Sequence, residues 1–151
     1  MSEEPQEKYV HDPRLQKAVE DVMGHETFAP VHDFKVVAVF AKGKAPADRE
    51  AASCRKISNA IRTVSGIDFL LTFWTAEWDL MKRSERHRII VHELMHVGIN
   101  DKGDPKVRRH SGDFCEIPEH DKESAELAKT IPISTSLDKL TQAKIDGSEK
   151  E

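Results

Sequence analysis

Residues 84–100, SERHRIIVHELMHVGIN, form the stretch that decides the fold. Ser84 is a suitable helix N-cap, and Glu85 places a carboxylate near the positive end of the helix dipole. Apolar side chains then cover nearly the whole circumference of the expected helix: Ile89, Ile90, Val91, Leu94, Met95, Val97 and Ile99. Such a helix is buried on most sides. The segment NDKGDP, residues 100–105, is expected to end it.

This buried helix carries three polar side chains in the pattern H-E-x-x-H, namely His92, Glu93 and His96. Residues four apart lie one above the other on a helix, so both imidazoles can bind one zinc ion. Glu93 projects to one side of that pair, where its carboxylate can act as general base on a zinc-bound water. Zinc lowers the pKa of that water toward about 7 and polarises a substrate carbonyl. The sequence therefore predicts a zinc-dependent metallopeptidase that hydrolyses peptide bonds.

A third protein ligand is expected downstream, because a catalytic zinc ion generally has three protein ligands and one open position. The longer pattern H-E-x-x-H-x-x-G-x-x-H is absent, since Ile99 and Lys102 stand where it needs Gly and His. The candidates are the zinc-binding side chain types that follow the helix: His110, Asp113, Glu116, Glu119 and His120.

Residues 45–114 resemble the putative phage metallopeptidase family, whose members are similar to SprT-like (Spartan-like) and other minimal zincin domains. The resemblance is carried by five features: RKIS at residues 55–58, IDFLL at 67–71, Trp78, the arginine-containing run into HELMHV, and a later H-x-x-x-F element. In those families the histidine that opens such an element is the third zinc ligand. The resemblance therefore implies that His110, in HSGDF, is the third ligand, with the alternatives above still open.

The rest of the chain predicts an α+β, minimal zincin-like domain in which a small β-sheet packs against helices. Residues 9–23 and 48–64 have apolar side chains at helical spacing, and a glycine follows each range. Residues 33–41 and 67–74 are rich in β-branched and aromatic side chains, which predicts two strands that pair near each other. Residues 42–46 predict a loop, and residues 75–81 a short helix or turn. The second strand is the candidate edge for an extended peptide substrate.

The chain of 151 residues is 33% charged and 38% hydrophobic. This composition predicts one folded domain at residues 9–133, between flexible charged tails at residues 1–8 and 134–151. No apolar run is long enough to cross a membrane and the acidic N-terminus does not resemble a signal peptide, so we expect a cytoplasmic protein. Two cysteines, Cys54 and Cys115, are too few for a disulfide framework, and we expect free thiols.

Two functions are compatible with these features. The first is the zinc metallopeptidase, with a peptide or protein substrate. The second is a non-enzymatic zinc-binding module that interacts with protein or DNA, in which a fourth protein ligand closes the coordination shell. The formal net charge of −4 gives no overall attraction for nucleic acid, so a nucleic acid partner is possible but is not supported by the charge. The sequence does not define an oligomeric state.

Overall fold

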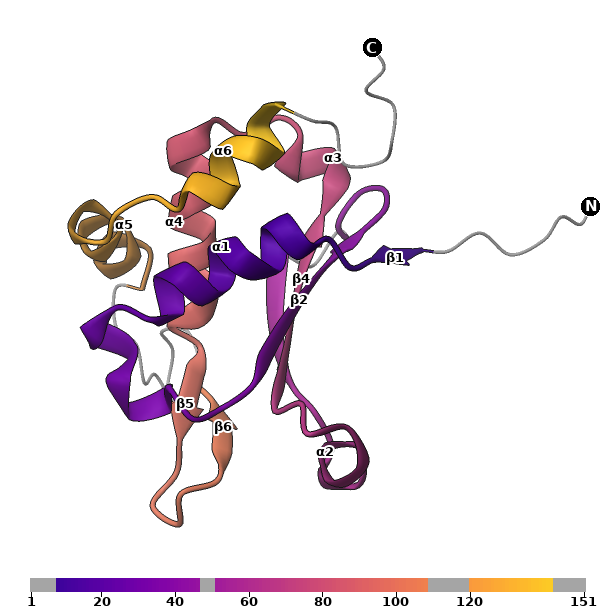
Figure 1. Cartoon of the computed structure of the whole chain (residues 1–151), viewed down its shortest axis with the longest axis vertical. Coiled ribbons are helices and arrows are strands. Elements are labelled where there is room, and N and C mark those ends of the chain that lie inside the picture. The colour runs from indigo at the N-terminus through magenta and orange to yellow at the C-terminus, as the bar shows by residue number, and fades with distance from the viewer. Residues whose placement is uncertain (1–7, 47–50, 109–119, 143–151) are drawn as a thin grey trace, which may run out of the picture.

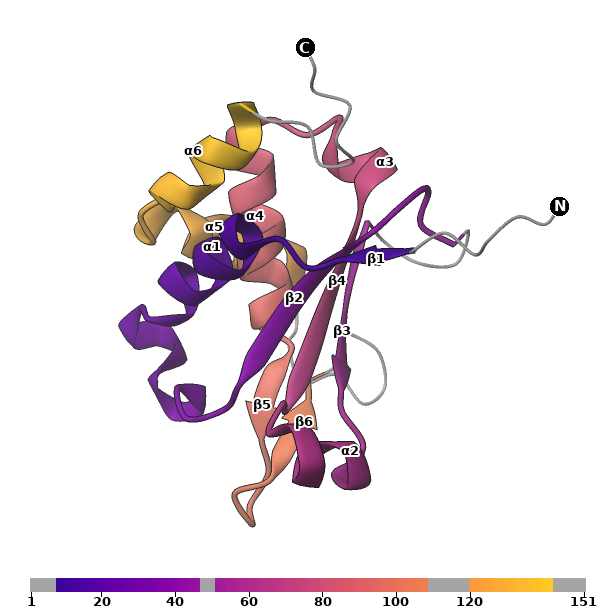
Figure 2. The same cartoon turned by 45° about the vertical axis from the view of Figure 1, so that its right-hand side comes forward.

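The computed structural model of the chain describes residues 8–46, 51–108 and 120–142. A mixed four-stranded sheet has its larger helices gathered on one side (Figures 1 and 2). The strand order is β1-β2-β4-β3, and the strands are β1 (Tyr9–Val10), β2 (Val36–Ala41), β4 (Phe69–Trp74) and β3 (Ala52–Lys56). β2 and β4 run parallel, whereas β1 and β3 run antiparallel to their neighbours. The predicted α+β class is confirmed.

The helical layer consists of α1 (Pro13–Met23), α4 (Arg83–Leu94), α5 (His120–Thr130) and α6 (Thr135–Gln142). Three short helices join other elements: η1 (Glu26–Val31), α2 (Asn59–Ser65) and α3 (Thr75–Trp78). An antiparallel hairpin of β5 (Val97–Ile99) and β6 (Pro105–Val107) follows α4. Across the described residues, no helix is both long and apolar enough to cross a membrane.

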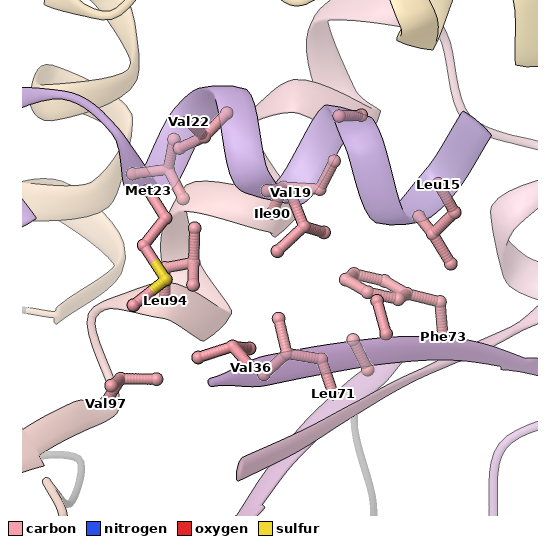
Figure 3. Close-up of a cluster of buried hydrophobic side chains, with 14 of the residues drawn as sticks. Leu15, Val19, Val22, Met23, Val36, Leu71, Phe73, Ile90, Leu94 and Val97 are labelled. Atoms are coloured by element: carbon pink, nitrogen blue, oxygen red, sulfur yellow. The ribbon is translucent and has the colours of Figure 1, made fainter. Parts of the chain in front are cut away.

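The hydrophobic core lies between α1, α4 and the sheet (Figure 3). Leu15 and Val19 of α1 face Phe73 of β4, and all three side chains are fully buried. Ile90 and Leu94 of α4 fill the same core. Each fully buried apolar side chain of this size contributes about 1.5–3 kcal/mol. This packing holds the C-terminal end of α4, which carries His92 and Glu93 of the H-E-x-x-H pattern, against the sheet.

The two predicted strands pair directly, as expected, but begin later than predicted, at Val36 and Phe69. The prediction that the second of them is a sheet edge is wrong. β4 lies between β2 and β3, so both of its edges are used in backbone pairing. The edge strand on this side of the sheet is β3.

The prediction of one helix over residues 48–64 is wrong, because β3 occupies the middle of this range and α2 is the one helix among its described residues. The Ser58 hydroxyl accepts a hydrogen bond from the backbone N–H of Ile61 and begins α2. Gly66 ends α2 in the left-handed conformation at φ 76°, as predicted for a C-cap. A short apolar pattern fits either a strand or a helix, and pairing with β4 decides in favour of the strand.

Two other predicted boundaries also differ. The helix predicted over residues 9–23 begins at Pro13, because the Asp12 carboxylate caps it by accepting from the Arg14 backbone N–H at 2.8 Å. The tail predicted over residues 134–151 contains α6, because Leu137 and Leu140 lie on one face of a helix and are each only 1% exposed. α6 packs against α1 and α4 and completes the helical layer.

Candidate metal centre

The H-E-x-x-H pattern lies where α4 ends and the β5–β6 hairpin begins. The helix predicted over residues 84–100 is shorter than expected. It begins at Arg83, because the Glu85 carboxylate accepts from the Lys82 backbone N–H at 2.7 Å, and it ends at Leu94. Residues predicted to continue it form β5 instead, because they pair with β6. His92 and Glu93 are therefore helical, and His96 stands in the turn after the helix.

The turn keeps the two imidazoles together although His96 is outside the helix. The backbone N–H of His96 donates to the carbonyl of Glu93 at 3.1 Å, which closes the last turn tightly. As a result the ring centroids of His92 and His96 lie 5.4 Å apart. The predicted proximity of these two side chains is retained, but a turn provides it rather than a continuous helix.

His92, Glu93 and His96 form a cluster whose possible ligand atoms all lie within 4.8 Å of one another. The Glu93 carboxylate Oε2 lies 3.9 Å from Nε2 of His92. His92 is 7% exposed and Glu93 only 2% exposed. Burying a carboxylate is costly unless a positive charge or hydrogen bonds compensate for the lost hydration, so a cation at this cluster would offset that cost.

The hydrogen bond made by His96 fits a metal ligand. Its Nδ1 lies 2.5 Å from the carbonyl oxygen of Arg108. A carbonyl oxygen can only accept, so Nδ1 donates and the lone pair of the neutral ring is on Nε2. Metal-binding histidines generally make this type of second contact, which fixes both the tautomer and the ring orientation. The donor set and this tautomer together fit a zinc ion.

Sequence reasoning missed the part played by Arg108. The β5–β6 pairing brings its backbone to His96, and the Arg108 N–H also donates to the His96 carbonyl at 2.7 Å. The contact uses backbone atoms, which every residue type has, so no side chain pattern indicates it. Gly98 is a residue whose type indicates this close approach, because a Cβ there would lie 2.7 Å from Cγ of Arg108 and 3.1 Å from the Lys106 carbonyl oxygen.

The edge strand β3 passes beside this cluster. Cys54 is opposite Leu71 in the β3–β4 register, and Leu71 is fully buried in the core on the helical side of the sheet. Cys54 therefore faces α4, which packs against β3. Burial and the Glu93 carboxylate raise the pKa of the Cys54 thiol, so Cys54 is a neutral free thiol on the face of β3 toward α4.

Most candidates for the third ligand fall outside the described residues: His110, Asp113, Glu116 and Glu119. Cys115 falls there too, and the side chain of His120, at the start of α5, is not described. The structure therefore brings together His92, Glu93 and His96 and leaves the third ligand a prediction.

Comparison with known proteins gives one match. Residues 7–131 match the model of a family described as putative phage metallopeptidase. This range includes the sheet, α4 and the His92–His96 cluster. No curated protein and no solved structure shows significant similarity to the chain.

Proposed function

Since the chain belongs to the putative phage metallopeptidase family, we propose that it is a zinc-dependent metallopeptidase that hydrolyses peptide bonds. His92 and His96 hold the zinc ion, and His110 is the proposed third ligand. The observation that carries the proposal is the compact cluster of two imidazoles and one carboxylate beside an edge strand. A bound zinc ion supplies Lewis acidity, which acidifies water and polarises a carbonyl group.

Glu93 is the proposed general base. Its carboxylate takes a proton from the attacking water and then passes that proton to the leaving amine. Two features of its surroundings support this role. The carboxylate is 2% exposed, so little bulk water weakens its interactions, and the Cys54 thiol is neutral and adds no second negative charge.

His96 and Arg108 keep the metal-binding ring in place. The Arg108 carbonyl accepts the Nδ1 proton, so Nε2 of His96 points its lone pair away from that bond. Arg108 is thus a positioning residue that acts through its backbone.

The substrate chain is proposed to bind to β3, which replaces the edge predicted from sequence. β3 pairs only with β4 among the described strands, and an extended peptide can add to such an edge through main-chain hydrogen bonds. Because β3 packs against α4, which carries Glu93, a peptide on this edge would run beside the proposed general base.

The test is the Glu93→Gln variant. It should retain bound zinc, because the two imidazoles are unchanged, and lose hydrolysis by about 10²–10⁴-fold, because the amide cannot accept the proton. Zinc content is measured by plasma mass spectrometry, and cleavage of a peptide mixture is measured by liquid chromatography with mass spectrometry.

Glu85→Gln is the matched control, because Glu85 is an exposed carboxylate at the other end of the same helix. It should keep both zinc and hydrolysis. Full activity in Glu93→Gln would exclude Glu93 as the base. A wild-type protein that binds zinc stoichiometrically but cleaves no peptide would support the non-enzymatic module instead.

A further inference from the structure

We propose that Lys56, the last residue of β3, is a specificity-determining residue that selects an acidic side chain in the bound peptide. The inference rests on the proposed function, because it names the substrate class of the same site.

Lys56 lies on the face of β3 that looks toward the metal centre. In the register with β4, Cys54 is opposite Leu71 and Lys56 is opposite Phe69, and both β4 side chains are fully buried on the helical side. Successive side chains of a strand alternate between faces, so Cys54 and Lys56 share one face. Two residues of strand span about 6.6 Å, which places Lys56 just beyond Cys54, on the face of β3 that α4 covers.

Arg55 lies on the opposite face of the same strand. Its partner in the register is Leu70, between the two buried positions of β4. Arg55 and Lys56 are both exposed cations. They therefore differ in the side of the sheet that they face, and Arg55 serves as an internal control.

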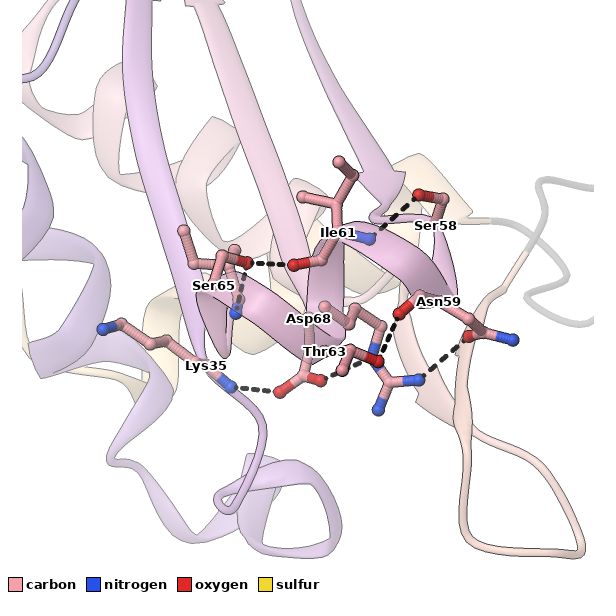
Figure 4. A network of polar contacts seen from close by, with 9 residues as sticks. Lys35, Ser58, Asn59, Ile61, Thr63, Ser65 and Asp68 are labelled. Carbon is pink, nitrogen blue, oxygen red and sulfur yellow. Dashed lines mark hydrogen bonds and ion pairs between the residues drawn. The ribbon is translucent and has the colours of Figure 1, made fainter.

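Lys56 lines a polar groove between the end of β3, α2 and the β5–β6 hairpin. A second cation there, Arg62, already has a carboxylate partner, because its Nε donates to Asp68 at 2.8 Å. Asp68 also accepts from the backbone N–H of Lys35 at 2.8 Å, and this network ties α2 to the sheet (Figure 4). Among the described residues, the Lys56 ammonium has no such partner. The exposed Asp104 carboxylate of the hairpin lines the same groove and opposes an acidic ligand.

A peptide that adds to β3 would place one side chain directly opposite Lys56. Directly opposite residues of paired strands have Cβ atoms about 4.5–5.5 Å apart, and opposite charges at such positions attract while like charges repel. An exposed ion pair of this kind contributes little to the free energy of binding, so we expect the Glu peptide to bind roughly 5-fold more tightly than the Lys peptide. The preference should weaken as salt is added.

Binding is measured in the Glu93→Gln background, so that the peptide stays intact. The probes are short fluorescein-labelled peptides that are identical except for Glu, Gln or Lys at every second position. Alternate positions share one face of a strand, so one peptide set covers every second register, and a second set with the substituted positions shifted by one residue covers the others. Fluorescence anisotropy should show tighter binding of the Glu peptide. Lys56→Glu should reverse the order, Arg55→Glu should leave it unchanged, and Asp104→Asn should enlarge the Glu preference.

Equal binding of the three peptides, or an equal effect of Arg55→Glu and Lys56→Glu, would overturn the inference. If the wild-type and Lys56→Glu proteins cleave the peptides equally well, the inference is rejected and the proposed function is kept. Lys56-dependent peptide binding by a protein that cleaves nothing would keep the inference and reject the proposed function. Thermal unfolding of each variant checks that the fold is retained.

Discussion

The imidazole of His96 shows how one contact prepares a side chain for a metal. Its Nδ1 donates to the Arg108 carbonyl, so the other ring nitrogen is left with its lone pair. His92 and Glu93 stand next to it, with possible ligand atoms within 4.8 Å. The two proposed imidazole ligands come from one turn of the chain, so the proposed third ligand must come from another segment. His110 is our choice for that ligand.

Replacing His110 with Ala should weaken zinc binding. We expect a loss larger than the 10–100-fold that is typical when a residue behind a ligand is changed, because a ligand itself is removed. Zinc affinity is measured by competition with a chromophoric chelator, and His11→Ala, at an exposed histidine, is the control. Unchanged stoichiometric zinc in His110→Ala would move the third ligand to Asp113, Glu116, Glu119 or His120.

At the scale of elements, the β5–β6 hairpin supports the end of α4. It follows the helix directly, and its far end returns Arg108 to His96. The close approach needs Gly98, since any Cβ there would meet the Arg108 side chain and the Lys106 carbonyl. The hairpin also contributes one wall of the groove that Lys56 lines.

Gly98→Ala should therefore lower zinc affinity although residue 98 is not a ligand. The added methyl group would lie 2.7 Å from Cγ of Arg108, so the end of β6 must shift and the bond from His96 is disturbed. We expect a loss of about 10–100-fold in zinc affinity, measured by the same chelator competition. Gly24→Ala is the matched control, because a Cβ at Gly24 meets its nearest atom at an ordinary 3.5 Å. Wild-type affinity in Gly98→Ala would contradict the positioning role of Arg108.

At the scale of the whole molecule, the helical layer holds α4 on the sheet. α5 and α6 both pack on α4, and His87 is buried where α4 meets α5. Its Nε2 donates to the carbonyl of Ala128 at 3.0 Å. Burial lowers the pKa of His87 below its ordinary 6.5, and the positive charge of Arg83 acts in the same direction.

This environment predicts that folding stability falls in mild acid. Below pH 6.5 the unfolded chain protonates His87 while the folded chain keeps it neutral, so the free energy of unfolding decreases as the pH falls through that value. Urea unfolding above and below pH 6.5 measures the change. His87→Gln can still donate to Ala128 and should show a smaller loss of stability in acid, whereas His11→Gln should behave as wild type. An identical pH dependence in His87→Gln and wild type would contradict the prediction.

The sequence alone predicts those features of the structure that depend on residues close together in the chain. The pattern of His92, Glu93 and His96 predicts that these three side chains lie together, because their spacing alone keeps them close, in a helix or in a tight turn. Strands β2 and β4 were predicted because a dense run of β-branched and aromatic residues has few alternatives in a buried sheet. The cap at Gly66 was also predicted, since a left-handed residue there favours glycine.

Backbone pairing between segments far apart in the chain determined the features that the sequence did not predict. Residues around Cys54 suit a strand or a helix equally, and β3 exists because β4 offers it a partner. This pairing makes β3, rather than β4, the edge strand to which we propose the substrate binds. Likewise, α4 ends at Leu94 because the next residues pair with β6, and the Arg108 carbonyl reaches His96 through that pairing. Backbone pairing between distant segments leaves little trace in local composition, because every residue type offers nearly the same main-chain groups. Residue types therefore predict the chemistry of the site, while the folded chain determines which strand borders it and which carbonyl accepts a hydrogen bond from His96.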